Sequence, residues 1–225
     1  AAGFASKIFH LGSLYSLTVN TIPSIISGLK LRRGDLDIQL LLNSNLDLVK
    51  KLKATELDAI IVALNETTQD QEFECLPMFQ DDIFLAVHKN SKYAALKEID
   101  LSQLKDETFL ILAKGFATRN DSEFVFEKAG IEPKVFLQVS DIFTLISMVN
   151  SGVGFALLPG RISSIYESSV KLIRLKQEYQ IKQEIGLVFL KSKERDPNLL
   201  ALIAECRMFT QKYNAQNAQK GNFPR

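Results

Sequence analysis

The sequence predicts an α/β fold organised in two lobes. Short apolar runs typical of buried strands alternate with segments whose apolar residues recur at helical spacing. A polar, irregular stretch at residues 65–74 divides this alternation into two series. Alternating strands and helices are typical of parallel sheets with helices on both faces. Two separate series favour two lobes over one sheet of ten strands.

The first series contains three strands and two helices. We expect the strands at residues 8–11, 36–42 and 58–64. The last of these is apolar on both faces, as a central parallel strand requires. A helix should lie within residues 14–29, and Pro23 indicates that it begins or bends there. The stretch Asn43-Ser44-Asn45 can cap a second helix over residues 46–52.

The second series is longer. We expect strands at residues 83–87, 109–113, 135–139, 172–175 and 185–190, and a glycine turn that runs into a buried strand over residues 152–159. Helices should cover residues 124–129 and 142–149, the second capped by Ser140-Asp141. A final helix begins at Asp196-Pro197, and the tail from Asn214 to Arg225 is polar and expected to fray.

Composition and charge exclude several classes of protein. The 225 residues carry 27 basic and 26 acidic side chains, a net charge of +1, and 46% of them are hydrophobic. This near-neutral balance argues against direct binding of nucleic acid. No apolar run approaches the ~18 residues of a membrane helix, and the first residues do not resemble a signal peptide. Cys75 and Cys206 are expected to be reduced thiols. Together, these observations favour a cytoplasmic protein without membrane contact.

The motifs of common enzymes are missing from the sequence. It contains neither a Gly-x-Ser-x-Gly elbow nor a Walker-type phosphate loop, and Gly152-x-Gly154 precedes a strand instead of a helix. His10 and His88 are expected to have structural or surface roles, and Asp81-Asp82 to solvate a strand end. We therefore expect no catalytic residue, no metal and no cofactor.

The strand-to-helix turns offer an anion site. In open parallel sheets, ligands bind beyond the carboxyl ends of the strands. Helix N-termini there present free N–H groups and partial positive charge. Small or hydroxyl residues occupy four such turns, at residues 12–16, 43–45, 115–118 and 140–141. The alternative is that these residues only cap their own helices.

The order of these elements resembles the effector-binding domain of LysR-type transcriptional regulators. The resemblance covers residues 6–210. It is carried by Ile8–Leu11 with the following Gly12 turn, by Glu56–Ile61, by Val149–Gly154 leading to Leu157-Leu158-Pro159, and by Leu187–Leu190 with the last helix. Within the family, the chain is similar to the regulators of malonate decarboxylase operons. The segments that carry this closer similarity are Leu11–Leu17, Asp81–Ala86, Gly115–Thr118, Asp141–Phe143 and Leu158–Arg161.

The resemblance implies a type II periplasmic-binding-protein-like fold: two Rossmann-like lobes with mixed, mostly parallel sheets, joined by two crossover strands. Lobe I would comprise residues 6–80 and 183–210, lobe II residues 81–182, and a polar tail residues 211–225. Such regulators also carry an N-terminal winged helix-turn-helix domain, which these 225 residues do not contain. Binding of DNA and action on RNA polymerase would belong to the longer protein.

The resemblance also implies an effector, a small carboxylate such as malonate, bound between the lobes. Family contacts fall on Ser13, Leu14, Tyr15, Ser44, Asn45, Gly115, Phe116, Ala117 and Thr118, and Arg119 is added as a candidate. The negative charge of the effector would be neutralised by Lys114, Arg119 or Arg161. The sequence departs from the family pattern at two places. Asn45 stands where many relatives have a Ser or Thr that caps the second helix. Arg32-Arg33-Gly34 replaces the commoner ending with Pro, which suggests a surface change.

Other readings remain open at this point. The resemblance implies a homodimer or homotetramer, formed through the helices that start near Ser16 and near Ser122. A periplasmic-type solute-binding protein for a small organic anion is the alternative function, because it shares the two-lobe design. An enzyme acting on a carboxylate ranks third, because no base or nucleophile is evident.

Overall fold

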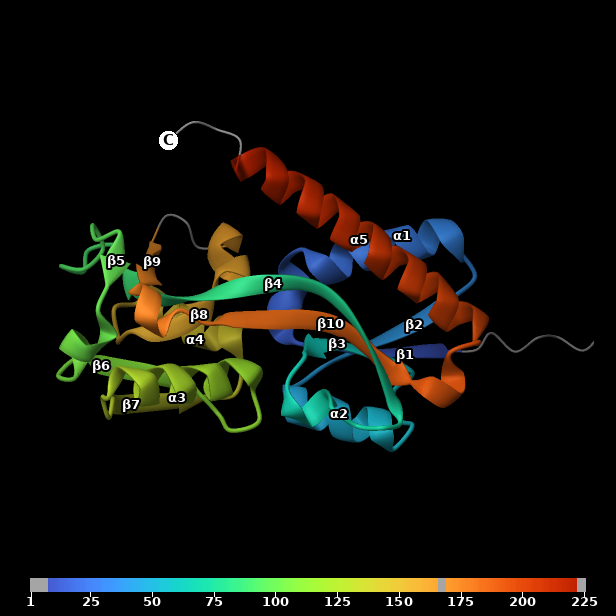
Figure 1. The fold of residues 1–225 in the computed structure, drawn as a ribbon, viewed down its shortest axis with the longest axis horizontal. Helices are drawn as coiled ribbons and strands as arrows, with labels where there is room; N and C mark the ends of the chain where they lie inside the picture. The colour runs from blue at the N-terminus through green and yellow to red at the C-terminus, as the bar shows by residue number, and fades with distance from the viewer. Residues whose placement is uncertain (1–7, 166–168, 222–225) are drawn as a thin grey trace, which may run out of the picture. The chain divides into compact units, whose positions relative to one another are not determined.

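The computed structural model describes residues 8–165 and 169–221 (Figure 1). The chain divides into two compact units: unit 1 contains the described residues up to Phe79 and from Glu184 onward, and unit 2 contains Gln80–Gln183. The chain passes from one unit to the other inside two strands, β4 (Phe73–His88) and β10 (Lys182–Leu190). Residues 6–7, 166–168 and 222–225 of the expected lobes and tail lie outside the described residues.

Unit 1 is an α/β unit built on a sheet with the strand order β2-β1-β3-β10-β4. Strand β1 pairs in parallel with β2 and β3, whereas β10 runs antiparallel to β3. All residues of β3 are buried, which confirms the expected central strand. In chain order the elements are β1 (Ile8–Ser13), α1 (Thr21–Arg32), β2 (Asp37–Leu42), α2 (Asn45–Lys53), β3 (Ala59–Ala63) and α5 (Pro197–Gly221). Three single-turn 3₁₀ helices, Tyr15–Val19, Glu66–Thr68 and Lys191–Lys193, connect them.

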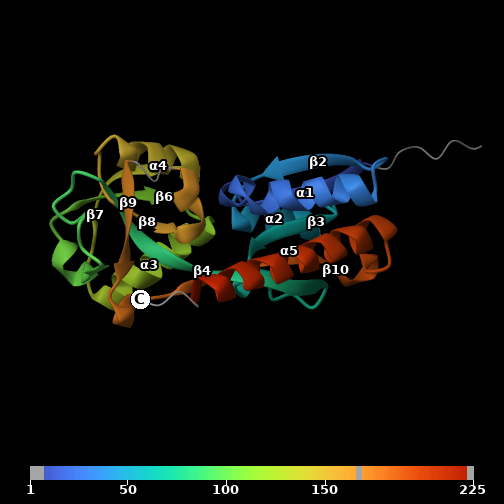
Figure 2. The same cartoon turned by 90° about the horizontal axis from the view of Figure 1, so that it is seen from above.

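Helix α1 begins just before Pro23 and does not bend there. A 3₁₀ turn precedes it, and Pro23 occupies its third position, where a backbone N–H would lack an intrahelical partner. Figures 1 and 2 show α1 lying beside α5. Gly28 allows this approach, because an added Cβ would fall 1.9 Å from a carboxylate oxygen of Glu205. Arg32 lies at the surface, as expected, with 42% of its side chain exposed, and it also pairs with that buried carboxylate at 2.9 Å.

The C-terminal segment differs from the expected frayed tail. Helix α5 continues through Asn214 to Gly221, with its polar side chains from residue 214 to 220 exposed. None of the helices in the described ranges combines the length and apolarity needed to cross a membrane.

Unit 2 contains two groups of strands. Strand β4 pairs antiparallel with β8 (Ala156–Pro159) and with β9 (Val170–Leu175), and β5 (Glu98–Ile99) adds in parallel to β9. A separate parallel pair is formed by β6 (Thr108–Leu112) and β7 (Lys134–Val139). Helices α3 (Ala117–Ala129) and α4 (Ile142–Asn150) follow β6 and β7, and 3₁₀ helices cover Leu101–Leu104, Gly160–Ile165 and Gln177–Tyr179.

The core of unit 2 centres on Phe109, which is fully buried. Its ring meets those of Phe126 and Phe155 edge to face, with centroids 5.0 and 6.2 Å apart. The strand expected at residues 83–87 is the end of the sixteen-residue β4, which starts inside the stretch we expected to be irregular. This length matters for the site, because Asp81 lies within β4 and not at its end.

Candidate functional site

The first group of predicted site residues lies in unit 1, beside the carboxyl ends of β1 and β2. Ser13 ends β1 and is level with Leu42, which ends β2. The Asn43 N–H donates to the Ser13 carbonyl at 3.3 Å, so the turn after β1 and the start of α2 are adjacent. Ser13 and Leu14 are buried and Tyr15 is half-buried. The Ser13 hydroxyl donates to the Leu14 carbonyl at 2.9 Å.

The start of α2 is capped by Ser44 and fastened by Asn45. The Ser44 hydroxyl oxygen accepts the Asp47 N–H at 3.2 Å. Asn45 is therefore the first helical residue and not the cap that we expected from the family pattern. Its buried side-chain amide exchanges two hydrogen bonds with the Ala63 backbone, at 2.9 and 3.1 Å. This amide holds α2 against the end of β3.

The start of α3 differs from those of α2 and α4. Asp141 caps α4 by accepting two backbone N–H groups, whereas Phe116 precedes α3 and offers no side-chain acceptor. Gly115 turns the chain into the helix with a φ of +94°, a left-handed conformation that favours glycine. The first turn of α3 carries no acidic residue. Its N–H groups and partial positive charge are the features that an anion requires.

The three candidate cations differ in their surroundings. Lys114 is exposed beside this turn. The Arg119 guanidinium pairs with Glu123 at 2.7 Å and donates to the Leu112 carbonyl at 2.8 Å. Arg161 pairs with Asp81 at 3.3 Å, and its side chain is 10% exposed. Two of the three guanidinium or ammonium groups are thus held by partners inside unit 2.

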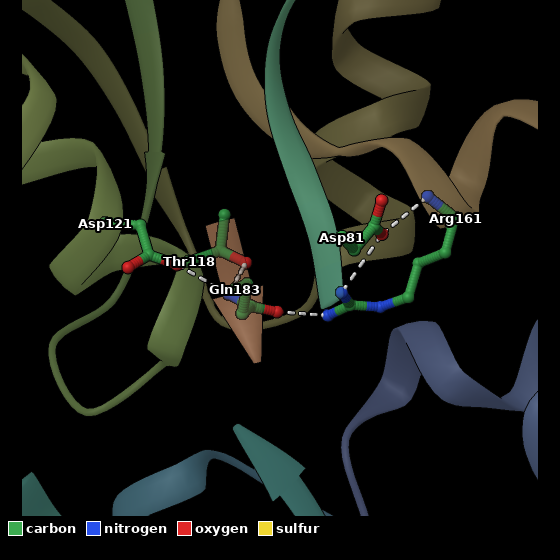
Figure 3. A network of polar contacts seen from close by, with 5 residues as sticks. All are labelled: Asp81, Thr118, Asp121, Arg161 and Gln183. Carbon is green, nitrogen blue, oxygen red and sulfur yellow. Dashed lines mark hydrogen bonds and ion pairs between the residues drawn. The ribbon is translucent and has the colours of Figure 1, made fainter. Parts of the chain in front are cut away.

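A buried polar network connects four segments of unit 2 (Figure 3). Asp81 on β4 accepts the backbone N–H of Arg161 at 2.8 Å, in addition to the ion pair. Arg161 also donates to the side-chain oxygen of Gln183, at the start of β10. The Gln183 side-chain nitrogen donates to Asp121 at 2.7 Å and to the Thr118 hydroxyl at 3.4 Å, both on α3.

The expectation that Asp81-Asp82 solvates a strand end is wrong for Asp81. The two side chains point to opposite faces of β4, and Asp81 points inward, where burial raises the pKa of its carboxyl against the opposing charge of Arg161. Asp82 is half-exposed and pairs with Lys182 at 3.4 Å and Arg174 at 3.6 Å. Gln183 and Asp121 were missed, because isolated polar residues 62 positions apart leave no sequence pattern.

The cysteines and histidines form no site in the described ranges. Cys75 and Cys206 are free, and burial raises the pKa of both thiols. Within residues 8–165 and 169–221, no group of three or more His, Cys, Asp or Glu side chains could hold a metal ion.

Comparison with known proteins gives a consistent family assignment. The model of the LysR substrate binding domain matches residues 3–210. The malonate utilization transcriptional regulator of Klebsiella pneumoniae is 44% identical over 214 residues, which cover 95% of this chain and 70% of that protein. The HTH-type transcriptional regulator YybE of Bacillus subtilis is 24% identical over 190 residues, covering 84% of this chain and 64% of YybE. The chain thus spans about two thirds of these relatives.

Solved structures with the same fold confirm the predicted architecture. The effector binding domain of QuiR in complex with shikimate has a TM-score of 0.81 at 20% identity, covering 92% of this chain and 99% of that one. The regulatory domain of Synechocystis CcmR in complex with 2-PG has a TM-score of 0.80 at 16% identity, covering 90% and 97%. Both likenesses establish a type II periplasmic-binding-protein-like fold.

The two adjacent carboxylates of β4 should differ sharply in their effect on stability. Asp81→Leu should lower the free energy of unfolding by about 3–5 kcal/mol, because it removes the carboxylate partner of a buried guanidinium. Asp82→Leu, the matched control, should cost less than about 1 kcal/mol, because its ion pairs are solvated. Urea unfolding followed by circular dichroism measures both values, and equal losses would contradict the assignment.

Proposed function

Because the chain belongs to the LysR substrate-binding domain family, we propose that it is the effector-sensing part of a transcriptional regulator and that its effector is a small dicarboxylate, malonate. Malonate is proposed on the similarity to the Klebsiella regulator, whose name specifies malonate utilization. The relatives are transcriptional regulators, which favours this function over the periplasmic-type solute-binding alternative and over an enzyme.

The observation that carries the proposal is the uncapped start of α3. The N–H groups after Phe116 face no side-chain cap, and the turn contains no carboxylate that would repel an anion. A helix dipole contributes typically ~0.3–1 kcal/mol and each hydrogen bond to a carboxylate ~1.5–3 kcal/mol. A few such interactions correspond to dissociation constants from micromolar to millimolar.

Two carboxylate groups suit two clusters of donors. We assign one carboxylate to Gly115, Phe116, Ala117 and Thr118 in unit 2, with Lys114 or Arg119 supplying positive charge. The second is assigned to Ser13, Leu14, Tyr15, Ser44 and Asn45 in unit 1. At Asn45 the available donor is the backbone N–H, because the side-chain amide is bonded to Ala63.

A ligand that engages both units would favour one arrangement of the units over others, in proportion to its difference in affinity for them. In the longer protein, this change would pass to the DNA-binding domain and to RNA polymerase. Both partners belong to the proposal.

Titration calorimetry tests the ligand class. Malonate should bind with a dissociation constant in the micromolar to millimolar range, and acetate at least about tenfold more weakly, because it fills only one donor cluster. Succinate tests whether the site accepts a longer spacing between the two carboxylates. Absence of heat with all three, or equal affinity for malonate and acetate, would refute the dicarboxylate site.

A charge placed at the cap position tests the location. Phe116→Asp should raise the malonate dissociation constant at least about tenfold relative to Phe116→Asn. Both variants lose the same ring and gain a side-chain cap, but only Asp adds a negative charge. Thermal unfolding of the pair controls for stability. Identical malonate affinities of the Asp and Asn variants would show that the anion does not bind at the start of α3.

We also propose self-association through apolar surface on both units, as a homodimer or homotetramer. Leu31 on α1 is 90% exposed, and Phe136 on β7 is 71% exposed. Further exposed apolar residues are Leu40 and Leu41 on β2, Phe124 on α3 and Val135 on β7. Strands β2 and β7 are edge strands, and exposed apolar edges are typical of interfaces.

Sedimentation velocity tests this association. Phe136→Ser should raise the dimer dissociation constant at least about tenfold, because it removes an apolar anchor. Leu96→Ser, at a 45% exposed residue of the loop before β5, is the control and should leave the dimer intact. A monomeric unsubstituted chain, or equal effects of both substitutions, would count against this surface.

A further inference from the structure

We propose that Gln183 is a positioning residue that orients the first turns of α3 and directs the Thr118 hydroxyl to donate a hydrogen bond to an anionic ligand. This inference rests on the anion site proposed at the start of α3. It goes beyond that site because Gln183 lies on another element, β10, and is not one of the proposed ligand contacts.

The first step is the fixed orientation of the Gln183 amide. Its oxygen accepts from the Arg161 guanidinium, and its nitrogen donates to the Asp121 carboxylate at 2.7 Å. A cation faces one end of the amide and a carboxylate the other. In a flipped amide, the nitrogen would face the donors of the guanidinium and the oxygen would face the carboxylate, so neither hydrogen bond could form. Gln183 is 3% exposed, which removes water as a competing partner. Its N–H groups therefore face α3.

The second step is the effect of this orientation on Thr118. The Thr118 oxygen accepts a Gln183 N–H at 3.4 Å, and a hydroxyl has one proton to donate. Over residues 8–165 and 169–221, the structure contains no acceptor for that proton. Because a neighbouring N–H occupies one lone pair of Thr118, the hydroxyl is set as a donor. Thr118 lies in the uncapped turn, where a donor suits a carboxylate.

The third step is the anchorage of Gln183 itself. Arg161, which holds the amide oxygen, is bound twice by Asp81, through its guanidinium and its backbone N–H (Figure 3). Asp81 and Gln183 lie on β4 and β10, the two strands through which the chain leaves unit 2. The orientation of the α3 turn is thus set by groups attached to both of these strands.

The experiment has an arm that needs no ligand. Amide hydrogen exchange of α3 should be at least about tenfold faster over residues 119–121, whose N–H groups are the first to be hydrogen-bonded in the helix, in Gln183→Leu than in the unsubstituted chain. Gln180→Leu is the control, because Gln180 donates to the Leu175 carbonyl at 2.9 Å and not to α3. Unchanged exchange in Gln183→Leu, or an equal rise in Gln180→Leu, would overturn the positioning role.

The second arm separates orientation of Thr118 from general support of the fold. Gln183→Glu replaces the donor by an acceptor that would take the Thr118 proton, and it should weaken malonate binding more than Gln183→Leu does. In a double-mutant cycle, Thr118→Val should weaken binding at least about fivefold in the unsubstituted chain but less than twofold in Gln183→Leu. Additive effects would overturn the action through Thr118.

The two proposals fail in distinguishable ways. If malonate does not bind the unsubstituted chain, the proposed effector is wrong, and the exchange arm alone decides whether Gln183 positions α3. If malonate binds but the cycle is additive, the effector stands and the inference about Gln183 falls.

Discussion

Buried polar groups in this fold must find hydrogen-bonding partners, and this requirement determines which groups stay open to a ligand. The carboxylate of Asp81 is held by Arg161, and the amide of Asn45 by the Ala63 backbone. Both side chains are fully used within their own units. No side chain caps the starts of α1 and α3, whereas side chains cap the starts of α2 and α4.

The helices α2, α3 and α4 differ in how their starts are capped. The Ser44 side chain accepts one N–H group at the start of α2, and the Asp141 side chain accepts two at the start of α4. Helix α3 begins instead after a glycine in a left-handed conformation and a phenylalanine. A turn of this kind leaves N–H groups for water or an anion. The proposed anion site thus lies at a helix start that, like the start of α1 and unlike those of α2 and α4, has no side-chain cap.

The fold could be predicted from the sequence because it depends on periodicity. The fully apolar β3 leaves a short continuous apolar run, and the apolar face of α4 leaves a pattern of period 3.6. Helix α5 beyond Asn214 could not be predicted, because its polar residues lack such a pattern and follow the helix already begun. The length of β4 was underestimated for a similar reason, since its first residues include a proline and charged side chains.

The site was only partly accessible from the sequence. Turn residues such as Ser44 and Thr118 could be proposed from the sequence because capping and anion binding use residue types with local signatures. The contact of Thr118 with Gln183, and that of Gln183 with Arg161, could not be predicted, because these residues come from segments that approach only in the folded unit. The inward direction of Asp81 depends equally on the packing of β4, which its neighbour Asp82 does not reveal.

The division of the chain has a consequence for its synthesis. Unit 2 is one continuous stretch, whereas unit 1 needs β10 and α5, which come from the last part of the chain. On the ribosome, the amino-terminal segment with β1 and β3 therefore emerges with an open edge beside β3, and it stays incomplete while unit 2 can already fold. Chaperones that shield unpaired strands would have their longest opportunity on the part of unit 1 that precedes unit 2 in the chain.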